Sequence, residues 1–219
     1  MSWKASCMPD IAKTSLHLTI YKLPAGTFLH RIHQSCYGGT EFNPGTKGNA
    51  RFSPIATPDG TAIPTMYAGE TFDCAAMESI FHDVPFAPGF KSLAKSKLKD
   101  QVYSEINTTA ELMLVDLRTT ALRKLGIERK HLIDTEKDQY SSTREVAVAI
   151  HTQRPDAQGL LWTSRQDDSA KSVVLFGHRI APGTLQQTAG PRDLVNDTTV
   201  YEKVLTLAER IGVEIVPGI

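Results

Sequence analysis

Alternating apolar and polar residues predict two neighbouring strands near the start of the chain, at residues 16–23 and 27–33, with a Pro-Ala-Gly turn between them. Side chains two residues apart share a face of a strand, so Leu29, Arg31 and His33 are expected to point the same way. The same reasoning predicts further strands at residues 101–107, 112–117, 159–163, 172–180 and 213–216.

A long segment rich in glycine and proline, residues 37–64, predicts a loop, and a loop of this length in a compact domain usually serves function. A short apolar segment, residues 65–69, follows it. Thr71 is then a suitable N-cap for a helix that places Glu78 near the end of its second turn.

Other helices are predicted from caps and periodicity. Ser142 and Glu145 form a capping box for a helix that runs to about residue 151. The remaining helices are expected at residues 92–98, at 119–125 before Gly126, and from 197 or 198 to 210. Strands and helices are interspersed without a regular βαβ repeat, which predicts an α+β fold.

Length and charge limit the domain organisation and the possible classes of protein. The 219 residues suit a single domain, expected at residues 16–219 after a flexible N-terminal arm, residues 1–15. The 24 basic residues balance 24 acidic ones, which argues against non-specific binding to nucleic acid or to a membrane surface. No apolar run approaches the ~20 residues of a membrane span, and no signal-peptide core is present, so we expect a cytoplasmic protein.

Common chemical signatures are absent. The sequence has no phosphate-binding Gly-rich loop, no His-Glu-x-x-His and no Gly-x-Ser-x-Gly. His30 and His33 are three residues apart on a predicted strand and so point to opposite faces, which makes them a poor pair of metal ligands, and we predict no metal site. The cysteines Cys7, Cys36 and Cys74 form no Cys-x-x-Cys pair and are expected to be reduced thiols.

Polar residues at the ends of apolar segments are the remaining candidates for chemistry, namely Arg31, Arg51, Tyr67, Glu78 and Ser164. Each also has a structural explanation. Arg31 is able to pair with a carboxylate on a neighbouring strand, and Tyr67 to be a core aromatic. Glu78 suits a solvated helix position, and Ser164 suits the start of a turn.

Five short motifs occur in a recognisable order. They are His-Arg-Ile (30–32), Asn-Ala-Arg-Phe-Ser-Pro (49–54), Ile-Pro-Thr-Met-Tyr-Ala (63–68), Ala-Ala-Met-Glu-Ser-Ile-Phe-His-Asp (75–83) and Gly-Leu-Leu-Trp-Thr-Ser-Arg (159–165). In this order they resemble the RES domain, over about residues 28–180. The family is named for a recurrent Arg, Glu and Ser, which fall here on Arg31, Glu78 and Ser164. Ala50 departs from the glycine that the family often has.

The resemblance implies a fold similar to mono-ADP-ribosyltransferases, with mixed sheets flanked by helices. It also implies an enzyme that degrades NAD⁺ at the nicotinamide–ribose bond, with water or inorganic phosphate as acceptor and no cofactor. Such proteins are the toxins of bacterial toxin–antitoxin pairs, and an Xre-type antitoxin is the implied partner. Whether the protein is a monomer or a homodimer stays open.

The candidate residues suit this reaction. Nicotinamide leaves as a neutral molecule, so one carboxylate suffices where ordinary glycoside hydrolysis needs two. Glu78 is expected to stabilise the positive charge that develops on the ribose. Arg31 and Arg51 are expected to bind the diphosphate through planar forks, and Tyr67 to stack on nicotinamide.

Ser164 is expected to bind a phosphate or the nicotinamide amide. His82, four residues after Glu78, is expected on the same side of the helix, where it orients the carboxylate or caps the helix end.

Two alternatives stay open. One is transfer of ADP-ribose to a protein or nucleic acid, although Ala76-Met77-Glu78 lacks the second acidic or amide residue typical of arginine-directed transfer. The other is a nucleotide-binding module without catalysis.

Overall fold

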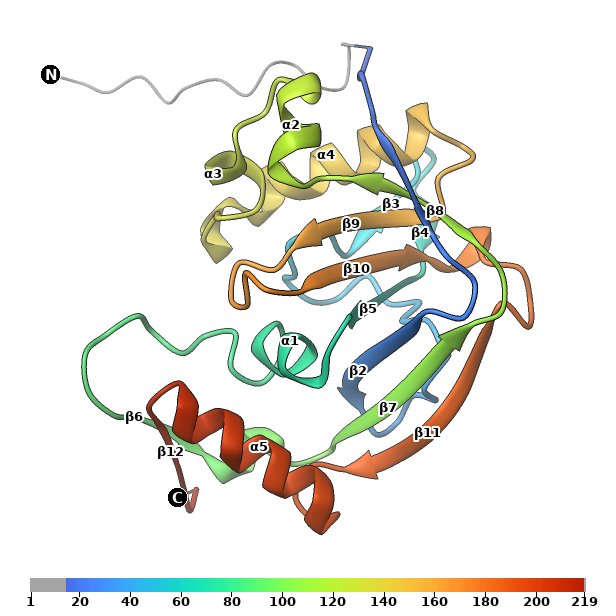
Figure 1. Cartoon of the computed structure of the whole chain (residues 1–219). Coiled ribbons are helices and arrows are strands. Elements are labelled where there is room, and N and C mark those ends of the chain that lie inside the picture. The colour runs from blue at the N-terminus through green and yellow to red at the C-terminus, as the bar shows by residue number, and fades with distance from the viewer. Residues whose placement is uncertain (1–14, 219) are drawn as a thin grey trace, which may run out of the picture.

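One curled, eight-stranded mixed sheet forms the centre of the computed structural model, which describes residues 15–218 (Figure 1). The strand order is β1-β8-β9-β10-β5-β2-β7-β11, and every neighbouring pair is antiparallel except β8 and β9. Its strands are β1 (Ile20–Leu23), β2 (Phe28–Gln34), β5 (Thr65–Gly69), β7 (Gln101–Thr108), β8 (Leu112–Asp116), β9 (Gly159–Thr163), β10 (Lys171–Phe176) and β11 (Leu185–Asp193). A hairpin of β3 (Ile55–Ala56) and β4 (Ala62–Ile63) and a parallel pair of β6 (Lys91–Ala94) and β12 (Val213–Val216) complete the strands.

The helices form two groups (Figure 1). α2 (Thr119–Leu125), α3 (Arg129–Leu132) and α4 (Tyr140–Gln153) make the crossover between the parallel strands β8 and β9. α1 (Phe72–Met77) packs on β2 and β5 near the middle of the sheet, and α5 (Thr198–Arg210) lies beyond it at the other end. Parallel neighbours require such a crossover, which is why the longest run of helices falls between β8 and β9.

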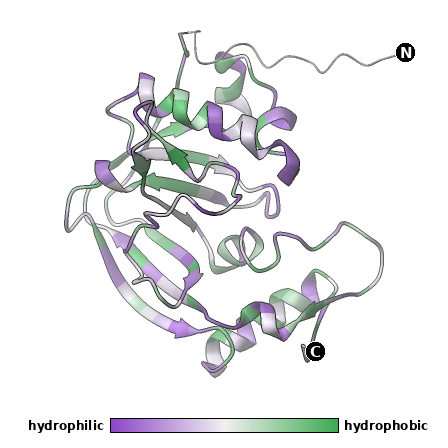
Figure 2. Ribbon diagram, turned by 180° about the vertical axis from the view of Figure 1, so that it is seen from behind, coloured by the Kyte–Doolittle hydropathy of each residue, from purple (hydrophilic) through white to green (hydrophobic). Residues whose placement is uncertain are grey.

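The hydrophobic core lies on both faces of the sheet. Val146 and Ile150 of α4 pack with Trp162 of β9 on one side, and α5 packs beside α1 in a separate cluster. A third cluster takes side chains from all eight strands, among them Leu29, Met66 and Leu161, so it fills the inside of the curl. Figure 2 shows the contrast between the hydrophobic central strands and the largely hydrophilic edge strand β11.

Much of the predicted order is confirmed. The α+β class is correct, Thr71 caps α1 by accepting a hydrogen bond from the amide of Cys74, and α5 follows Asp197 as its cap. Gly126 ends α2 with a positive φ of 75°. The arm expected at residues 1–15 lies, apart from Ser15, outside the described residues.

Four expectations are wrong in detail. The first strand begins only at Ile20, and the strand predicted to reach residue 180 ends at Phe176. Residues 92–98 are not one helix, because β6 pairs with the distant β12 before a short 3-10 turn begins. Ser142 and Glu145 lie inside α4, which already begins at Tyr140 and has no side-chain cap bond at Gln139. No strand was expected at the polar β11.

A pair of histidines supports a pH prediction. Nε2 of His151 on α4 lies 3.0 Å from Nε2 of His178, so at most one hydrogen fits between the two rings. Burial, with added repulsion from Arg179 and His178, lowers the pKa of His151 to about 4. The unfolded chain therefore binds this proton more readily, and folding stability is complete above the unfolded pKa of ~6.5 and falls as the pH drops toward 4.

We expect the melting temperature to fall between pH 7 and pH 5, and to fall less in His151→Gln. Calorimetry at both pH values measures this. His33, whose pKa burial and Arg31 also lower to about 4, titrates in both proteins, and burial also lowers the pKa of His178, so the difference between the two proteins reports the His151–His178 pair. Equal decreases in the two proteins would contradict the prediction.

Candidate functional site

Two adjoining hollows lie beside β5 and the loop at residues 43–54. The larger, of about 750 Å³, is lined by residues that include Arg31, His33, Tyr37 and Lys47. The smaller, of about 290 Å³, is lined by residues that include Arg51, Glu78, His82, Tyr140 and Trp162. Asn49, Ala50 and Tyr67 line both, so the hollows meet at the Tyr67 side chain.

Glu78 enters the smaller hollow from the end of α1. Gly69 lets α1 approach β5 closely, because a Cβ at this position would lie 2.9 Å from the amide of Ala75. Glu78 then closes the helix as its C-cap, with its amide donating to Cys74. The Ser164 hydroxyl donates to Oε1 of the half-buried Glu78 carboxylate at 2.6 Å. The carboxylate is thus fixed by one oxygen and faces the hollow.

Arg51 supplies a buried cation with a free edge. Its Nη1 donates to Oγ1 of Thr135 at 2.8 Å and to the Thr135 carbonyl at 3.3 Å, and its guanidinium lies 5.0 Å from the centre of the Tyr140 ring. The side chain is 4% exposed, yet Nε and Nη2 have no acceptor among the described residues. Arg154 uses the same two nitrogens to hold both carboxylate oxygens of Asp156, at 2.9 and 2.7 Å. Arg51 therefore has an unused bidentate edge of the kind that fits a carboxylate or phosphoryl group, although its two nitrogens have almost no exposed surface, so a ligand reaches them only when neighbouring side chains move.

Aromatic side chains line the junction of the hollows. The Tyr67 hydroxyl accepts the amide hydrogen of Phe52 at 2.9 Å, and its ring meets Trp162 edge to face at 6.1 Å. Burial, with a smaller effect of the Glu78 charge, raises the pKa of Tyr67 to about 12, so the phenol is neutral at physiological pH. Nε1 of Trp162 is also buried without an acceptor in the described part of the chain.

Arg31 organises the larger hollow. Its Nη1 donates to the carbonyls of Gly38, Gly39 and Glu41 at 3.1, 2.7 and 2.7 Å, which fixes the loop that follows β2. Burial lowers the pKa of Arg31 to about 10, against the opposing effect of Glu41, so the side chain stays charged at neutral pH. Its positive charge in turn helps to keep the neighbouring His33 neutral.

The predicted residues thus occupy different places. Arg51, Tyr67 and Glu78 meet at the smaller hollow, and Arg31 lies in the larger one. Ser164 has no exposed surface and lines neither hollow. The expected direct contact of Ser164 with substrate does not fit this burial; the side chain instead supports Glu78, and its Oγ accepts the amide hydrogens that begin the turn after β9.

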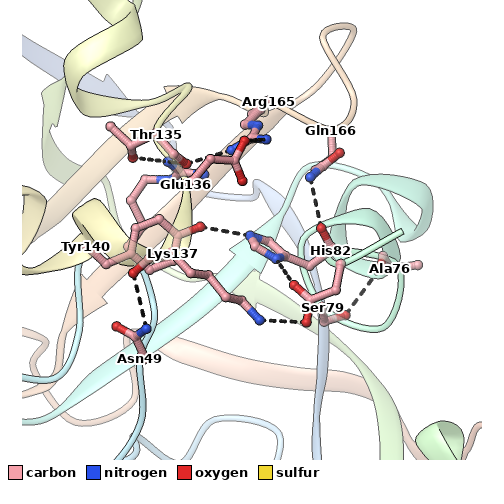
Figure 3. Close-up of polar contacts among 12 residues, drawn as sticks. Asn49, Ala76, Ser79, His82, Thr135, Glu136, Lys137, Tyr140, Arg165 and Gln166 are labelled. Atoms are coloured by element: carbon pink, nitrogen blue, oxygen red, sulfur yellow. Dashed lines mark hydrogen bonds and ion pairs between the residues drawn. The ribbon is translucent and has the colours of Figure 1, made fainter. Parts of the chain in front are cut away.

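His82 is not on the same helix side as Glu78, because α1 already ends at Met77. The expectation that it orients the carboxylate is therefore replaced by a different contact. Figure 3 shows His82 between two partners, with its Nε2 3.0 Å from the Tyr140 hydroxyl and its carbonyl accepting from Gln166. The sequence gives no periodic or motif signal for Thr135 and Tyr140, which contact Arg51 from the segment before and at the start of α4.

Replacing Ser164 by alanine is expected to lower kcat for the reaction proposed below about 10- to 150-fold, with little change in substrate affinity, since a hydrogen bond to a charged group contributes ~1.5–3 kcal/mol. Initial rates over a range of substrate concentrations would show this. Ser172→Ala, which removes a buried hydroxyl on the adjoining β10 that contacts Cys74, is the matched control and should keep wild-type kcat. A selective loss of affinity in Ser164→Ala would instead indicate direct contact.

Comparison with known proteins agrees with this architecture. The sequence profile of the RES domain matches residues 28–194, which is more than half of the chain. The protein belongs to the RES domain family, and its fold is of the α+β class.

Among solved structures, the chain is similar to one from the crystal structure of the M. tuberculosis MbcT–MbcA toxin–antitoxin complex. The TM-score is 0.56 at 16% identity, and the match covers 77% of this chain and 84% of the other. A search of curated proteins found no match.

Two kinds of feature are absent from residues 15–218. No helix there is long and apolar enough to cross a membrane. No group of three or more His, Cys, Asp or Glu side chains within that range is placed to hold a metal ion.

Proposed function

We propose that this protein consumes NAD⁺ by cleaving the bond between nicotinamide and ribose, and that it acts as the toxin of a toxin–antitoxin pair. The observation that carries the proposal is the smaller hollow, which both Glu78 and Arg51 line, together with the buried, unpaired edge of Arg51. An anion-binding edge near an oriented carboxylate suits a substrate that carries a phosphate and whose ribose becomes positively charged in the transition state.

In the proposed reaction, the electron pair of the glycosidic bond moves to the pyridinium nitrogen, and nicotinamide leaves neutral. Oε1 of Glu78 is held by Ser164, which leaves Oε2 to accept a hydrogen bond from a ribose hydroxyl. The carboxylate then stabilises the positive charge on C1 and the ring oxygen more strongly in the transition state than in the substrate. Water or inorganic phosphate attacks C1, and a proton is released to solvent when water is the acceptor.

The rest of the dinucleotide is assigned by space and charge. The smaller hollow, about 290 Å³, is too small for NAD⁺, whereas ligand sites of this size class run to ~1,000 Å³. We therefore place the substrate across both hollows, with Tyr67 at the junction as the stacking surface. Arg51 binds one phosphate, and Arg31 attracts the remainder of the ligand to the larger hollow.

The toxin assignment rests on the family and on the toxin–antitoxin complex to which the fold is similar. An enzyme that depletes NAD⁺ must be restrained in its host, so we propose an antitoxin of Xre type that blocks the hollows, and action in the cytoplasm. Expression of the chain alone should arrest bacterial growth, and co-expression of the antitoxin should restore it. Normal growth with abundant, folded wild-type protein would contradict the toxin role.

The direct test is incubation of purified protein with NAD⁺, with and without inorganic phosphate, followed by chromatography. Free nicotinamide is the expected product, and the sugar product identifies the acceptor. Intact NAD⁺ after long incubation would contradict the enzyme assignment. ADP-ribose found on a macromolecule in cell extract would favour transfer, and binding without nicotinamide release would favour a binding module.

A further inference from the structure

Arg51 is restrained by a segment that the family motifs do not include, the stretch from the end of α3 to the first turn of α4. Thr135 lies in this stretch and Tyr140 begins α4. Both are almost fully buried, with 2% and 1% of their surfaces exposed. Their contacts with Arg51 use one nitrogen and one face of the guanidinium and leave the Nε–Nη2 edge untouched.

Thr135 fixes the guanidinium in its own plane. Both of its oxygens accept from Nη1 of Arg51, and its carbonyl also accepts from Nη1 of Arg165 at 2.6 Å (Figure 3). Arg165 directly follows Ser164, which holds Glu78. A single buried residue therefore connects the turn behind the carboxylate to the arginine beside it.

Tyr140 fixes the orientation of that plane. The guanidinium lies over its ring, and the Tyr140 hydroxyl is in turn held by His82 at 3.0 Å. The backbone of Arg51 is also fixed, because the Thr143 hydroxyl on α4 donates to its carbonyl. Any rotation of the guanidinium out of this position would break the Thr135 bonds and the contact with the Tyr140 ring together.

We propose that Thr135 and Tyr140 are positioning residues that aim the free edge of Arg51 at a phosphoryl group in the smaller hollow. This inference rests on the proposed function for the identity of the ligand. A guanidinium that is already held in place loses less conformational entropy on binding than a mobile one. The pre-oriented Arg51 would therefore favour an anion that accepts two hydrogen bonds. Neither residue needs to touch the substrate.

The test compares isosteric replacements. Thr135→Val removes the Oγ1 acceptor and keeps the shape, whereas Thr135→Ser keeps the acceptor. Tyr140→Leu removes the stacking face, whereas Tyr140→Phe keeps it. We expect Thr135→Val and Tyr140→Leu to raise KM for NAD⁺ about 10-fold with kcat within twofold, because binding is lost equally in substrate and transition state. Thr135→Ser and Tyr140→Phe should remain within about threefold of wild type.

A second measurement distinguishes a change in the orientation of Arg51 from a general loss of packing in the site. Inorganic pyrophosphate, used as the probe of the anion site, should bind Thr135→Val about 10-fold more weakly in calorimetry, while inhibition by nicotinamide stays unchanged. Equal pyrophosphate affinity in wild type, Thr135→Val and Tyr140→Leu would overturn the inference, as would parallel losses for pyrophosphate and nicotinamide. If Thr135→Val does not fold, the pyrophosphate affinities of Tyr140→Leu and Tyr140→Phe are compared instead, and equal affinities would overturn the inference.

Pyrophosphate binding requires no turnover, so the proposed reaction and the positioning role of Thr135 and Tyr140 can be contradicted independently of each other. Absence of nicotinamide release from wild type contradicts the proposed reaction only. Failure of the pyrophosphate difference, in a wild type that does release nicotinamide, contradicts the positioning role only.

Discussion

Glu78→Gln is expected to lower kcat for nicotinamide release 100- to 1000-fold while leaving the melting temperature nearly unchanged. The loss corresponds to ~3–4 kcal/mol of barrier, the size measured for other preorganised groups that stabilise transition-state charge. Glutamine has the same shape, and its carbonyl oxygen still accepts the hydrogen bond that Ser164 gives to Oε1. Only the negative charge that faces the ribose is lost. Single-turnover measurements with NAD⁺ and thermal melting would record both quantities.

The control for Glu78→Gln is Glu202→Gln, which changes an exposed glutamate on α5 away from both hollows. This variant should retain wild-type kcat. A large loss of stability in Glu78→Gln with kcat unchanged would instead mean that the carboxylate serves the fold, as the C-cap of a six-residue helix. Retained activity with retained stability would remove Glu78 from the mechanism altogether.

The elements that the sequence predicts well depend on local chemistry. The Thr71 cap, the Gly126 stop and the Asp197 cap each act within a few residues, so a single pass along the chain finds them. β6 and β11 escape the same reasoning. β6 owes its conformation to pairing with β12, more than a hundred residues away, and β11 is a polar edge strand whose apolar signal is weak.

In the candidate site too, features set by the local sequence were predicted, and contacts between distant residues were not. Glu78 lies at the end of α1, as the pattern predicted. Arg31 and Tyr67 were also expected at the ends of apolar segments, but they lie at the centres of β2 and β5. What each side chain contacts was not visible. Ser164 turns inward to Glu78 rather than out to a ligand, and Thr135 meets Arg51 across 84 positions of sequence. Such contacts arise only when the β8–β9 crossover folds back over the loop at residues 43–54.

A chain with no net charge is able to bind an anionic ligand when one of its cationic groups has no carboxylate partner. Several cations at or near the surface, such as Arg154, are paired with carboxylates, whereas the guanidinium edge of Arg51 is buried and unpaired. A buried cation without a counter-ion is costly to keep in a folded protein. That cost is offset when an anion binds, so the ligand is expected to stabilise the fold as well as occupy the hollow.

Arg51→Lys is therefore expected to lower kcat/KM for NAD⁺ about 10- to 150-fold, mainly through KM. Lysine keeps the positive charge and loses the planar fork, so the bidentate interaction is reduced to a single point charge. The loss corresponds to ~1.5–3 kcal/mol, the value of a hydrogen bond to a charged group. The melting temperature measured without ligand should change little or fall modestly, since the Thr135 acceptors lose a partner. The increase in melting temperature on adding pyrophosphate should be much smaller than in wild type.

The matched control is Arg154→Lys, because Arg154 uses the same two nitrogens on Asp156 and lines neither hollow. It should retain wild-type kcat/KM and the full stabilisation by pyrophosphate. If Arg51→Lys kept the affinity of wild type for both NAD⁺ and pyrophosphate, a point charge would suffice, and the free guanidinium edge would have no role in binding. If both lysine variants lost affinity equally, the effect would lie in a general disturbance of the fold rather than in the fork of Arg51, because Arg154 lines neither hollow and both substitutions keep the positive charge.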